Sequence, residues 1–456
     1  MKRRDFIKRV AQGSAAVSAI SAQRVLGANE RIGIGIIGFG LIGRLHARNF
    51  HALSGSRVTA VADVFQPRLD ASMESVGGEA VRYRDFRKLL EDKNVDAVVI
   101  ATPDHWHALM MMMACAAGKD VYVEKPLTLF VQEGRWMLDC ARRHKRIVQV
   151  GTQQRSAAHY ARARDLIRGG HIGELVSVQI QYFRNVSPGF GNPANGEPPR
   201  DLDYNLWLGP APQHAYNPNR SIYHFRWFWD YSGGQMTNLG QHSLDIVHWC
   251  TGATAPTRLA SFGSRRFLKD NCEVPDVQDA ILEYPNFTVV CQIRECAAGG
   301  TTTASSNLVF QGTKATLRIS RDGFEVVPDR KEAPENIVSR IMGGHPVGGP
   351  KSIGGPTNQF WGQSIKDTSG DRQNQLSDHA RHFLECVRAR QQPVSDLQSG
   401  HEVVTACHLA NISARLGRPV RWDAKAEKIV GDDEASAMLT KPYRAPWDAE
   451  LKGLLS

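Results

Sequence analysis

A glycine-rich turn that follows a strand-like run is the feature that most constrains how this chain can fold. Residues 32–37 lead directly into Gly38, Gly40 and Gly43, after which a helical pattern begins. In such a unit the first glycine permits a tight turn, the second lets a pyrophosphate approach the backbone, and the third lets helix and strand pack closely. Free N–H groups at the helix start favour phosphate. The pattern predicts a dinucleotide-binding turn made of Gly38, Phe39, Gly40, Leu41, Ile42 and Gly43.

An acidic residue at the end of the next strand-like run indicates which dinucleotide is bound. Asp63 follows Gly43 by twenty residues. A carboxylate at that distance can bind the ribose hydroxyls of NAD and repels the 2′-phosphate of NADP, so we expect NAD rather than NADP. The alternative is structural: the glycines would only pack a helix on a strand, and Asp63 would cap a helix.

Strand-like and helix-like patterns alternate from residue 31 to residue 150. The six strand-like runs predict a doubly wound parallel sheet. After residue 151, longer alternating runs separated by turn residues predict a large, mostly antiparallel sheet. The expected fold class is α/β, with an N-terminal Rossmann domain and a C-terminal α+β domain. The expected parts are a leader (1–28), the Rossmann domain (29–152), the second domain (153–423) and a C-terminal extension (424–456).

The first 28 residues carry half of the net charge of +10. The pair Arg3-Arg4 precedes a weakly apolar, Ala- and Ser-rich run and then small residues, a pattern that resembles a twin-arginine export signal. We therefore expect export of the folded protein to the periplasm. The remaining charge is unremarkable, so we expect no nucleic-acid partner. Because the longest apolar stretch, 108–117, is shorter than the ~18 residues of a span, we expect no membrane anchor.

Residues with useful chemistry follow two strand-like runs of the predicted Rossmann sheet. Thr102-Pro103 ends the fourth run, and Glu124-Lys125-Pro126 ends the fifth. Doubly wound sheets bind ligands at this carboxyl edge. A lysine beside a cationic nicotinamide has a lowered pKa and can exchange a proton with a hydroxyl. Taken alone, a lysine at the end of a strand, such as Lys125, is usually a solvated surface charge.

The motifs 38–43, Asp63, Thr102-Pro103 and Glu124-Lys125-Pro126, followed by an antiparallel domain, resemble the Gfo/Idh/MocA oxidoreductases. The resemblance implies that Lys125 is catalytic and that the substrate is a carbohydrate. It further implies a second domain that binds substrate and forms a homodimer or homotetramer. The residues expected to bind the cofactor besides the glycine turn are Asp63, Thr102, Pro103, His107, Glu124, Lys125 and Gln153.

Residues 233–245 look like the active-site helix of that family, in which an Asp is commonly followed four residues later by a His. His242 matches the histidine, the expected general base, although a satisfied core histidine is the alternative. Asn238 stands at the Asp position; its amide can hydrogen-bond a hydroxyl but cannot carry a proton. Asp245, one turn further on, is read as structural. The expected catalytic residues are Lys125, His242 and Asn238.

An aromatic stretch before this helix, 223–231, suits the apolar faces and hydroxyl rims of sugar rings, although core packing is the alternative for about half of it. The eight cysteines contain no C-x-x-C pair and no metal-ligand spacing, so we expect buried free thiols and no metal. The residues expected to contact substrate are His105, Arg155, Arg226, Trp227, Asn238 and His242.

Three functions fit these expectations. The first is an NAD-dependent oxidoreductase that acts on a hydroxyl or keto group of a sugar or glycoside with a tightly held cofactor, since an exported enzyme has no free NAD pool. The second is an NAD-dependent glycosidase that uses transient oxidation, elimination and re-reduction. The third is a non-catalytic sugar-binding protein with structural NAD, which Asn238 favours and Lys125 with His242 oppose.

Overall fold

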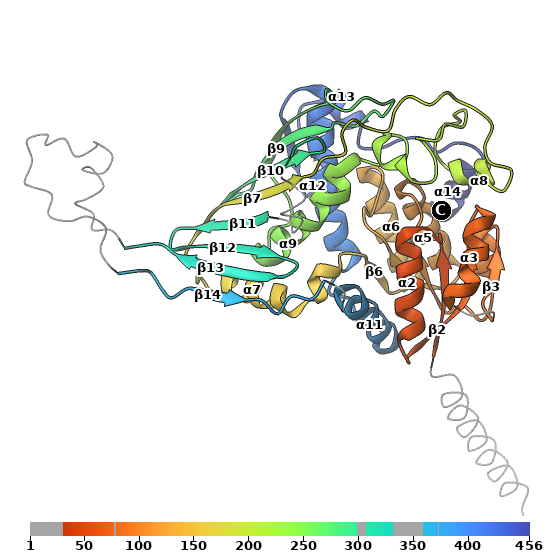
Figure 1. The fold of residues 1–456 in the computed structure, drawn as a ribbon, viewed down its shortest axis with the longest axis horizontal. Coiled ribbons are helices and arrows are strands. Elements are labelled where there is room, and N and C mark those ends of the chain that lie inside the picture. Colours follow the sequence, from red (N-terminus) through yellow and green to blue (C-terminus); the bar gives the residue numbers. More distant parts are fainter. Residues whose placement is uncertain (1–30, 77–78, 299–306, 332–358, 373) are drawn as a thin grey trace, which may run out of the picture.

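The computed structural model describes residues 31–76, 79–298, 307–331, 359–372 and 374–456. The predicted leader lies outside the described residues. So does most of the stretch 330–372, whose Gly-, Pro- and Ser-rich sequence lacks periodicity and predicts a long surface excursion. Figure 1 shows a parallel sheet wrapped by helices beside a broad, curved second sheet. The expected fold class is therefore confirmed.

The N-terminal domain is built on a parallel sheet, which has six strands in the described residues, in the order β3-β2-β1-β4-β5-β6. The order reverses direction between β1 and β4, the point at which doubly wound sheets bind ligands. Its strands are β1 (Ile32–Ile37), β2 (Ser56–Ala62), β3 (Val81–Tyr83), β4 (Ala97–Ile100), β5 (Asp120–Val123) and β6 (Val148–Val150).

Helices cover both faces of this sheet, which explains why its strands are apolar on both sides. Ile34 and Ile36 pack with Phe50 on one face, whereas Ile37 and Ile100 pack with the methionine-rich helix α5 on the other. The first face is covered by α2 (Leu41–Ala52), α3 (Gln66–Val76) and α11 (Asn374–Ala389), and the second by α4 (Phe86–Glu91), α5 (His107–Ala116), α6 (Val131–His144) and α14 (Trp447–Leu455).

The second domain is a large sheet with ten strands in the described part of the chain, in the order β14-β13-β12-β11-β7-β10-β9-β8-β15-β16. Its neighbours are antiparallel except for the parallel pair β7 and β10. The strands are β7 (Leu175–Phe183), β8 (Arg258–Ser264), β9 (Val277–Glu283), β10 (Thr288–Arg294), β11 (Asn307–Gly312), β12 (Ala315–Ser320), β13 (Gly323–Pro328), β14 (Ile365–Asp367), β15 (Val420–Asp423) and β16 (Lys428–Ile429).

Three long helices fill one face of this sheet and connect it to the Rossmann domain. Ile167, Val247 and Val403 on these helices share a core with alternate residues of the strands. The helices are α7 (Ala158–Arg168), α9 (Gln241–Thr251) and α12 (Leu397–Leu416). The short elements that border the interface are η1 (Asp104–Trp106), η2 (Gln153–Ser156), α8 (Tyr204–Leu208), η3 (His224–Trp227) and η4 (Met236–Gly240).

The predicted C-terminal extension is part of both domains rather than an appendage. Its strand β16 extends the second sheet through β15, and α13 (Asp433–Ala437) follows. Its last helix returns to the Rossmann domain, where Trp447 packs against Phe86 and Trp106. The stretch expected to lack regular structure, 330–372, contains the short strand β14, which pairs with β13.

The cysteines agree with the expectation from the sequence. Each cysteine is a free thiol in the structure, and all but Cys296 are buried, so the predicted buried thiols are confirmed. Within the described ranges, no helix combines the length and apolar character needed to cross a bilayer.

Candidate active site

The glycine turn has the geometry that its sequence predicts. Gly38 has φ +89°, and a Cβ there would lie 2.7 Å from the carbonyl oxygen of Ala101. A Cβ on Gly43 would lie 1.9 Å from the carbonyl oxygen of Gly38, so helix and strand need both glycines. At Gly40 the nearest atom to a Cβ is 3.5 Å away, on the Arg68 side chain. This open space faces the start of α2, which no side chain caps, and therefore fits a pyrophosphate.

Asp63 joins the glycine turn to the end of β2. Its Oδ2 accepts a hydrogen bond from the N–H of Phe39 at 2.7 Å, and its Oδ1 accepts one from the N–H of Phe65 at 2.9 Å. Arg68 lies 3.8 Å from the carboxylate. Burial raises the pKa of Asp63, although Arg68 and both backbone N–H groups oppose the rise. Each oxygen has lone-pair capacity left for a ribose hydroxyl.

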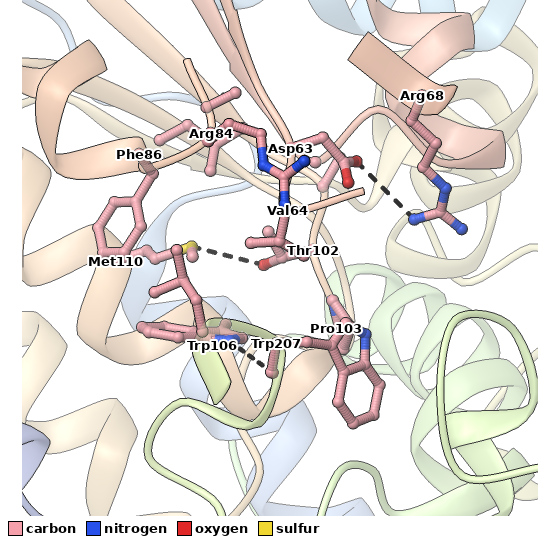
Figure 2. Close-up of a pocket in the computed structure, with 15 residues that line it drawn as sticks. Asp63, Val64, Arg68, Arg84, Phe86, Thr102, Pro103, Trp106, Met110 and Trp207 are labelled. Carbon is pink, nitrogen blue, oxygen red and sulfur yellow. Dashed lines mark hydrogen bonds and ion pairs between the residues drawn. The ribbon is translucent and has the colours of Figure 1, made fainter. Parts of the chain in front are cut away.

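A pocket opens beside Asp63 at this end of the turn (Figure 2). Arg68 lies on one side of the pocket, and the apolar side chains of Phe86, Trp106 and Met110 lie on the other. An apolar wall opposite a charged group suits a nucleoside, which has a flat ring and a polar sugar. The pocket is also lined by Ile37, Gly38, Ala62, Val64, Arg84, Ala101, Thr102, Pro103, Leu206 and Trp207.

Two residues predicted to bind the cofactor form hydrogen bonds that hold the turns at the carboxyl edge of the Rossmann sheet. The ring of His107 contacts the carbonyl oxygens of Pro126 and Thr102 at 2.6 and 3.0 Å, so it braces the turns after β4 and β5. Glu124 is buried and bonds His46 at 2.7 Å and the N–H of Lys125 at 3.0 Å. Although burial opposes it, His46 lowers the pKa of Glu124. These contacts give both side chains protein partners, and their contact with the cofactor stays a prediction.

Lys125 projects from the end of β5 toward the second domain. Its Nζ donates to Oδ1 of Asn238 at 2.8 Å and to the carbonyl oxygen of the same residue at 3.1 Å. Burial lowers the pKa of Lys125 to about 8, Glu124 opposes this, and the charges of Arg226 and Arg321 lower it further. A lysine with such a pKa can exchange protons near neutral pH. The structure therefore brings Lys125 and Asn238 together from separate domains.

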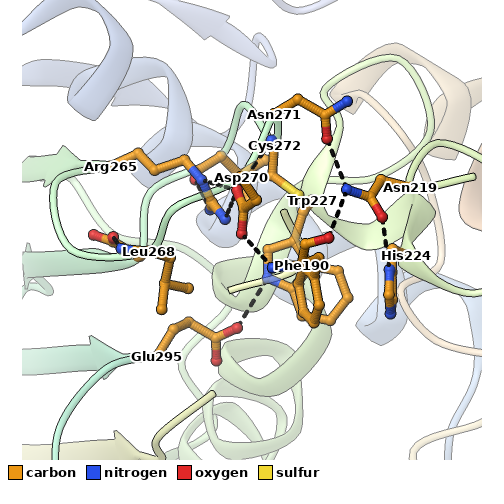
Figure 3. Close-up of polar contacts among 12 residues, drawn as sticks. Phe190, Asn219, His224, Trp227, Arg265, Leu268, Asp270, Asn271, Cys272 and Glu295 are labelled. Carbon is orange, nitrogen blue, oxygen red and sulfur yellow. Dashed lines mark hydrogen bonds and ion pairs between the residues drawn. The ribbon is translucent and has the colours of Figure 1, made fainter. Parts of the chain in front are cut away.

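A hydrogen-bonded chain fixes the orientation of the Asn238 amide. Its Nδ2 donates to Oε1 of Gln235 at 2.9 Å, which turns Oδ1 toward the lysine. Gln235 in turn donates to the buried Glu295 at 3.2 Å, and Glu295 also accepts from Nε1 of Trp227 at 2.9 Å (Figure 3). Asn238 lies in the π-helical turn η4, a form common at functional sites. The Trp227 indole is thus held from inside the protein through Nε1, and its contact with substrate stays a prediction.

His242 is the second residue of α9, which directly follows the π-helical turn. Its side chain is buried, and Nδ1 has no hydrogen-bond partner among the described residues. Burial lowers the pKa of His242 well below its usual value, and the charges of Lys125 and Arg321 lower it further. The imidazole is therefore neutral at pH 7 and can accept a proton from a hydroxyl. The alternative, a core histidine with all its hydrogen bonds made within the protein, does not agree with the unpartnered Nδ1.

Two other residues predicted to contact substrate have structural positions. Arg155 is buried and binds Asp245 through Nε and Nη2, at 2.9 and 2.8 Å, which agrees with the structural interpretation of Asp245 and leaves the substrate contact of Arg155 a prediction. His105 is buried, and its Nε2 contacts the carbonyl oxygen of Trp207 at 3.0 Å. Burial lowers the pKa of His105 to about 3. In contrast, Oε1 of Gln153 is buried without a partner in the described structure, which fits the prediction that it meets a ligand.

The site also contains two residues that the sequence analysis missed. Asp104 is buried and accepts a hydrogen bond from Ser232 at 2.5 Å, and burial raises its pKa. The position of Asp104 directly after Thr102-Pro103, at the carboxyl edge of the sheet, could have indicated from the sequence that it lies at the site. Arg321 lies on the turn between β12 and β13, and its charge acts on both Lys125 and His242. No local pattern marks Arg321, since only the fold brings this turn to the site.

The fold and the glycine turn define a two-domain nucleotide-binding protein. Residues 32–152 match the oxidoreductase family model for the NAD-binding Rossmann fold, and residues 184–260 and 364–449 match the model for its C-terminal alpha/beta domain. The chain therefore belongs to the Gfo/Idh/MocA family of oxidoreductases.

Known relatives resemble about a third of the chain in sequence and most of the chain in fold. Inositol 2-dehydrogenase of Salmonella paratyphi B is 32% identical over 151 residues, which cover 33% of this chain and 45% of that enzyme. Myo-inositol 2-dehydrogenase of Thermotoga maritima is 31% identical over 147 residues, 32% of this chain and 44% of that enzyme. The chain thus matches about half the length of these relatives. Levoglucosan dehydrogenase, solved with NADH and levoglucosan, is 17% identical, with TM-score 0.65 over 86% of this chain and 99% of its own.

Proposed function

We propose that this protein is an NAD-dependent oxidoreductase that acts on a hydroxyl or keto group of a sugar or glycoside. The observation that carries the proposal is Lys125, whose side chain binds Asn238 at the carboxyl edge of a Rossmann sheet and whose pKa is lowered. The charge of this lysine also lowers the pKa of His242, which is neutral. The related inositol 2-dehydrogenase and levoglucosan dehydrogenase support a polyhydroxylated substrate.

Each protein group has a distinct task in this reaction. A bound NAD would supply the hydride acceptor for oxidation and the hydride donor for reduction. The neutral amine of Lys125 takes the hydroxyl proton at Nζ, and the neutral ring of His242 accepts a hydrogen bond from the same hydroxyl or a neighbouring one. Asn238 directs Nζ and cannot take the proton itself. Glu295 and Gln235 keep that amide from rotating.

The first experiment identifies the nucleotide that the purified protein retains and then offers it sugars and glycosides while nicotinamide absorbance is followed. We expect NAD and substrate-dependent reduction of it. Glycoside cleavage with no net NADH would favour the redox-neutral glycosidase instead. If the protein neither retains nor binds a nicotinamide nucleotide, the proposal fails.

We predict that oxidation of the substrate depends on the protonation of Lys125. Because burial lowers its pKa to about 8, the base form is the minor form at neutral pH and increases as the pH rises. The kcat/KM for oxidation is therefore expected to rise through about pH 8 and then level off, and that for reduction to fall over the same range. Steady-state rates in both directions test this, and a flat profile between about pH 6 and 9 contradicts it.

Cofactor preference provides another prediction. Replacing Asp63 by Asn keeps an acceptor for the N–H of Phe39 but removes the charge beside Arg68 and Arg84, leaving two cations at the pocket. We expect the ratio of kcat/KM for NAD over NADP to fall at least about tenfold, because the repulsion of a 2′-phosphate is lost. Asp70→Asn on the exposed face of α3 serves as the control. An unchanged ratio in D63N would show that Asp63 does not select the cofactor.

A further inference from the structure

One wall of the nucleotide pocket comes from the second domain. Leu206 and Trp207 of α8 are buried and line the pocket together with Asp63 and Thr102 of the Rossmann domain (Figure 2). The carbonyl oxygen of Trp207 accepts a hydrogen bond from Nε1 of Trp106 at 3.0 Å, which binds α8 to another lining residue. A nucleoside in this pocket would therefore touch both domains.

The chain that leads into α8 is bound to the residues that follow β2. The N–H of Gln66 donates to the carbonyl oxygen of Asp201 at 3.0 Å, and the N–H of Asp203 donates to that of Val64 at 2.9 Å. These bonds belong to an antiparallel bridge between the two segments. Because Val64 also lines the pocket, the start of α8 is fixed beside the nucleotide through the backbone.

The chain that leaves α8 is held by Arg444 of the C-terminal segment. Its Nε donates to the carbonyl oxygens of Gly209 and Ala211, both at 3.1 Å. Its Nη1 donates to Oδ1 of Asn205 and Oε1 of Gln213, both at 2.9 Å, and its Nη2 donates to the carbonyl oxygen of Asn205 at 3.1 Å. One planar guanidinium thus joins the first turn of α8 to the residues that follow its end.

The residues on either side of this arginine are anchored to the Rossmann domain. The hydroxyl of Tyr443 donates to Oε1 of the buried Glu133 on α6 at 2.6 Å. The ring of Trp447, at the start of α14, packs on Phe86 and Trp106, with centroids 6.5 and 4.8 Å apart. Phe86 and Trp106 both line the nucleotide pocket. The C-terminal segment therefore connects α8 with the Rossmann side of the same pocket.

The contacts of Arg444 can break and re-form while both domains stay folded. They end on carbonyl and amide oxygens, and those of Nη1 and Nη2 lie at the surface. Water can replace such bonds, so breaking them leaves no buried charge without a partner. Opening of this kind is a local event that costs less free energy than unfolding.

We propose that residues 443–447 form a clasp that holds α8 against the nucleotide pocket, with Arg444 as its positioning residue, so that bound NAD leaves only when the clasp opens. This inference rests on the proposed function, because it assigns the pocket to the adenosine part of NAD. Release then requires breaking the contacts of Arg444 as well as those of the nucleotide, which makes exchange slow. A purified sample therefore keeps its nucleotide through steps that remove free NAD.

The experiment measures how fast NADH leaves the purified full-length protein. The protein is loaded with NADH and mixed with excess NAD, and the loss of energy transfer from tryptophan to NADH gives the dissociation rate. In R444M we expect this rate to rise at least about tenfold, because several hydrogen bonds that oppose opening are lost. Binding of NADH to the emptied protein should accelerate as well, because it also passes through the open clasp, so that Kd changes less than either rate.

A pocket that is merely damaged gives a different result, since NADH would leave faster without binding faster and Kd would rise with the dissociation rate. R444K keeps the charge but not the planar fork and should lie between the native protein and R444M. Y443F removes only the bond to Glu133 and should raise both rates by about two- to tenfold. Arg143→Met is the matched control, because Arg143 also donates to backbone carbonyl oxygens, in the last turn of α14, and these bonds do not involve α8.

Circular dichroism first establishes that each variant is folded. Equal exchange rates in the native protein, R444M and Y443F overturn the inference, and so does an R143M variant that exchanges as fast as R444M. If R444M accelerates exchange in both directions but no sugar is turned over, the proposed oxidoreductase function fails and this inference stands. If sugars are oxidised while the clasp variants exchange NADH like the native protein, only this inference fails. A protein that does not bind NADH at all contradicts both.

Discussion

Replacement of Lys125 by Met is expected to lower kcat by about a thousandfold while the protein remains folded and keeps its cofactor. Acid–base catalysis by a positioned group typically contributes 10²–10⁴-fold. Met has a similar length and no proton to exchange, and the buried amine that it removes has its side-chain contacts with Asn238 rather than with the glycine turn. Single-turnover reduction of bound NAD, together with quantification of the retained nucleotide, measures both expectations.

A second substitution separates proton transfer from simple positive charge. Arg at position 125 keeps the charge and the donors toward Asn238 but cannot release a proton near neutral pH. We expect K125R to be at least about a hundredfold slower than the native protein. Lys88→Met, at an exposed position of α4 that pairs with Glu91, controls for loss of a lysine. If K125R retains most of the activity, Lys125 acts as a charge and not as a base.

Most of the Rossmann domain could be predicted from local patterns. The glycine turn combines three nearby constraints: Gly43 is required by its contact with the Gly38 carbonyl within the same βαβ unit, and Gly38 by its positive φ and by the Ala101 carbonyl after β4. The strands are apolar on both faces because helices cover both, so their signal is strong. The last helices of the chain were harder to place, because α11 and α14 pack on a domain that begins more than 300 residues earlier.

The site itself could be predicted only in part, and the limits of that prediction share a physical cause. Lys125, Asn238 and His242 each lie in a local motif that the sequence shows. Lys125 directly follows a strand of the Rossmann sheet, and Asn238 and His242 stand four residues apart. For Arg155, Trp227 and His105, residue type alone suggested substrate contact. In the structure each of them has a buried partner on a distant element. Arg155 binds Asp245 of α9, Trp227 binds Glu295 directly after β10, and His105 contacts the carbonyl oxygen of Trp207 in α8. A single sequence does not show which polar groups satisfy one another across distant elements.

The Arg155–Asp245 pair leads to the largest stability effect that we expect. Both side chains are buried, and the pair joins η2 to α9, the helix that carries His242. Asp245→Asn leaves a buried guanidinium without its counter-charge, which typically costs about 3–5 kcal/mol. Arg155→Met strands the carboxylate in the same way. We expect each single variant to unfold at clearly lower urea concentration, measured by circular dichroism.

The double variant R155M/D245L tests whether the pair is structural or whether Arg155 also serves the substrate. Replacing a buried ion pair by apolar groups of similar volume is often neutral for stability, so the double variant should recover most of the loss. The exposed pair Arg258–Glu283 provides the control, since E283Q should cost no more than about 1 kcal/mol. If Arg155 contacted substrate, R155M and the double variant would share a raised KM despite their different stabilities. We expect the double variant to regain a native KM, because a repacked η2–α9 junction returns His242 to its position beside Lys125.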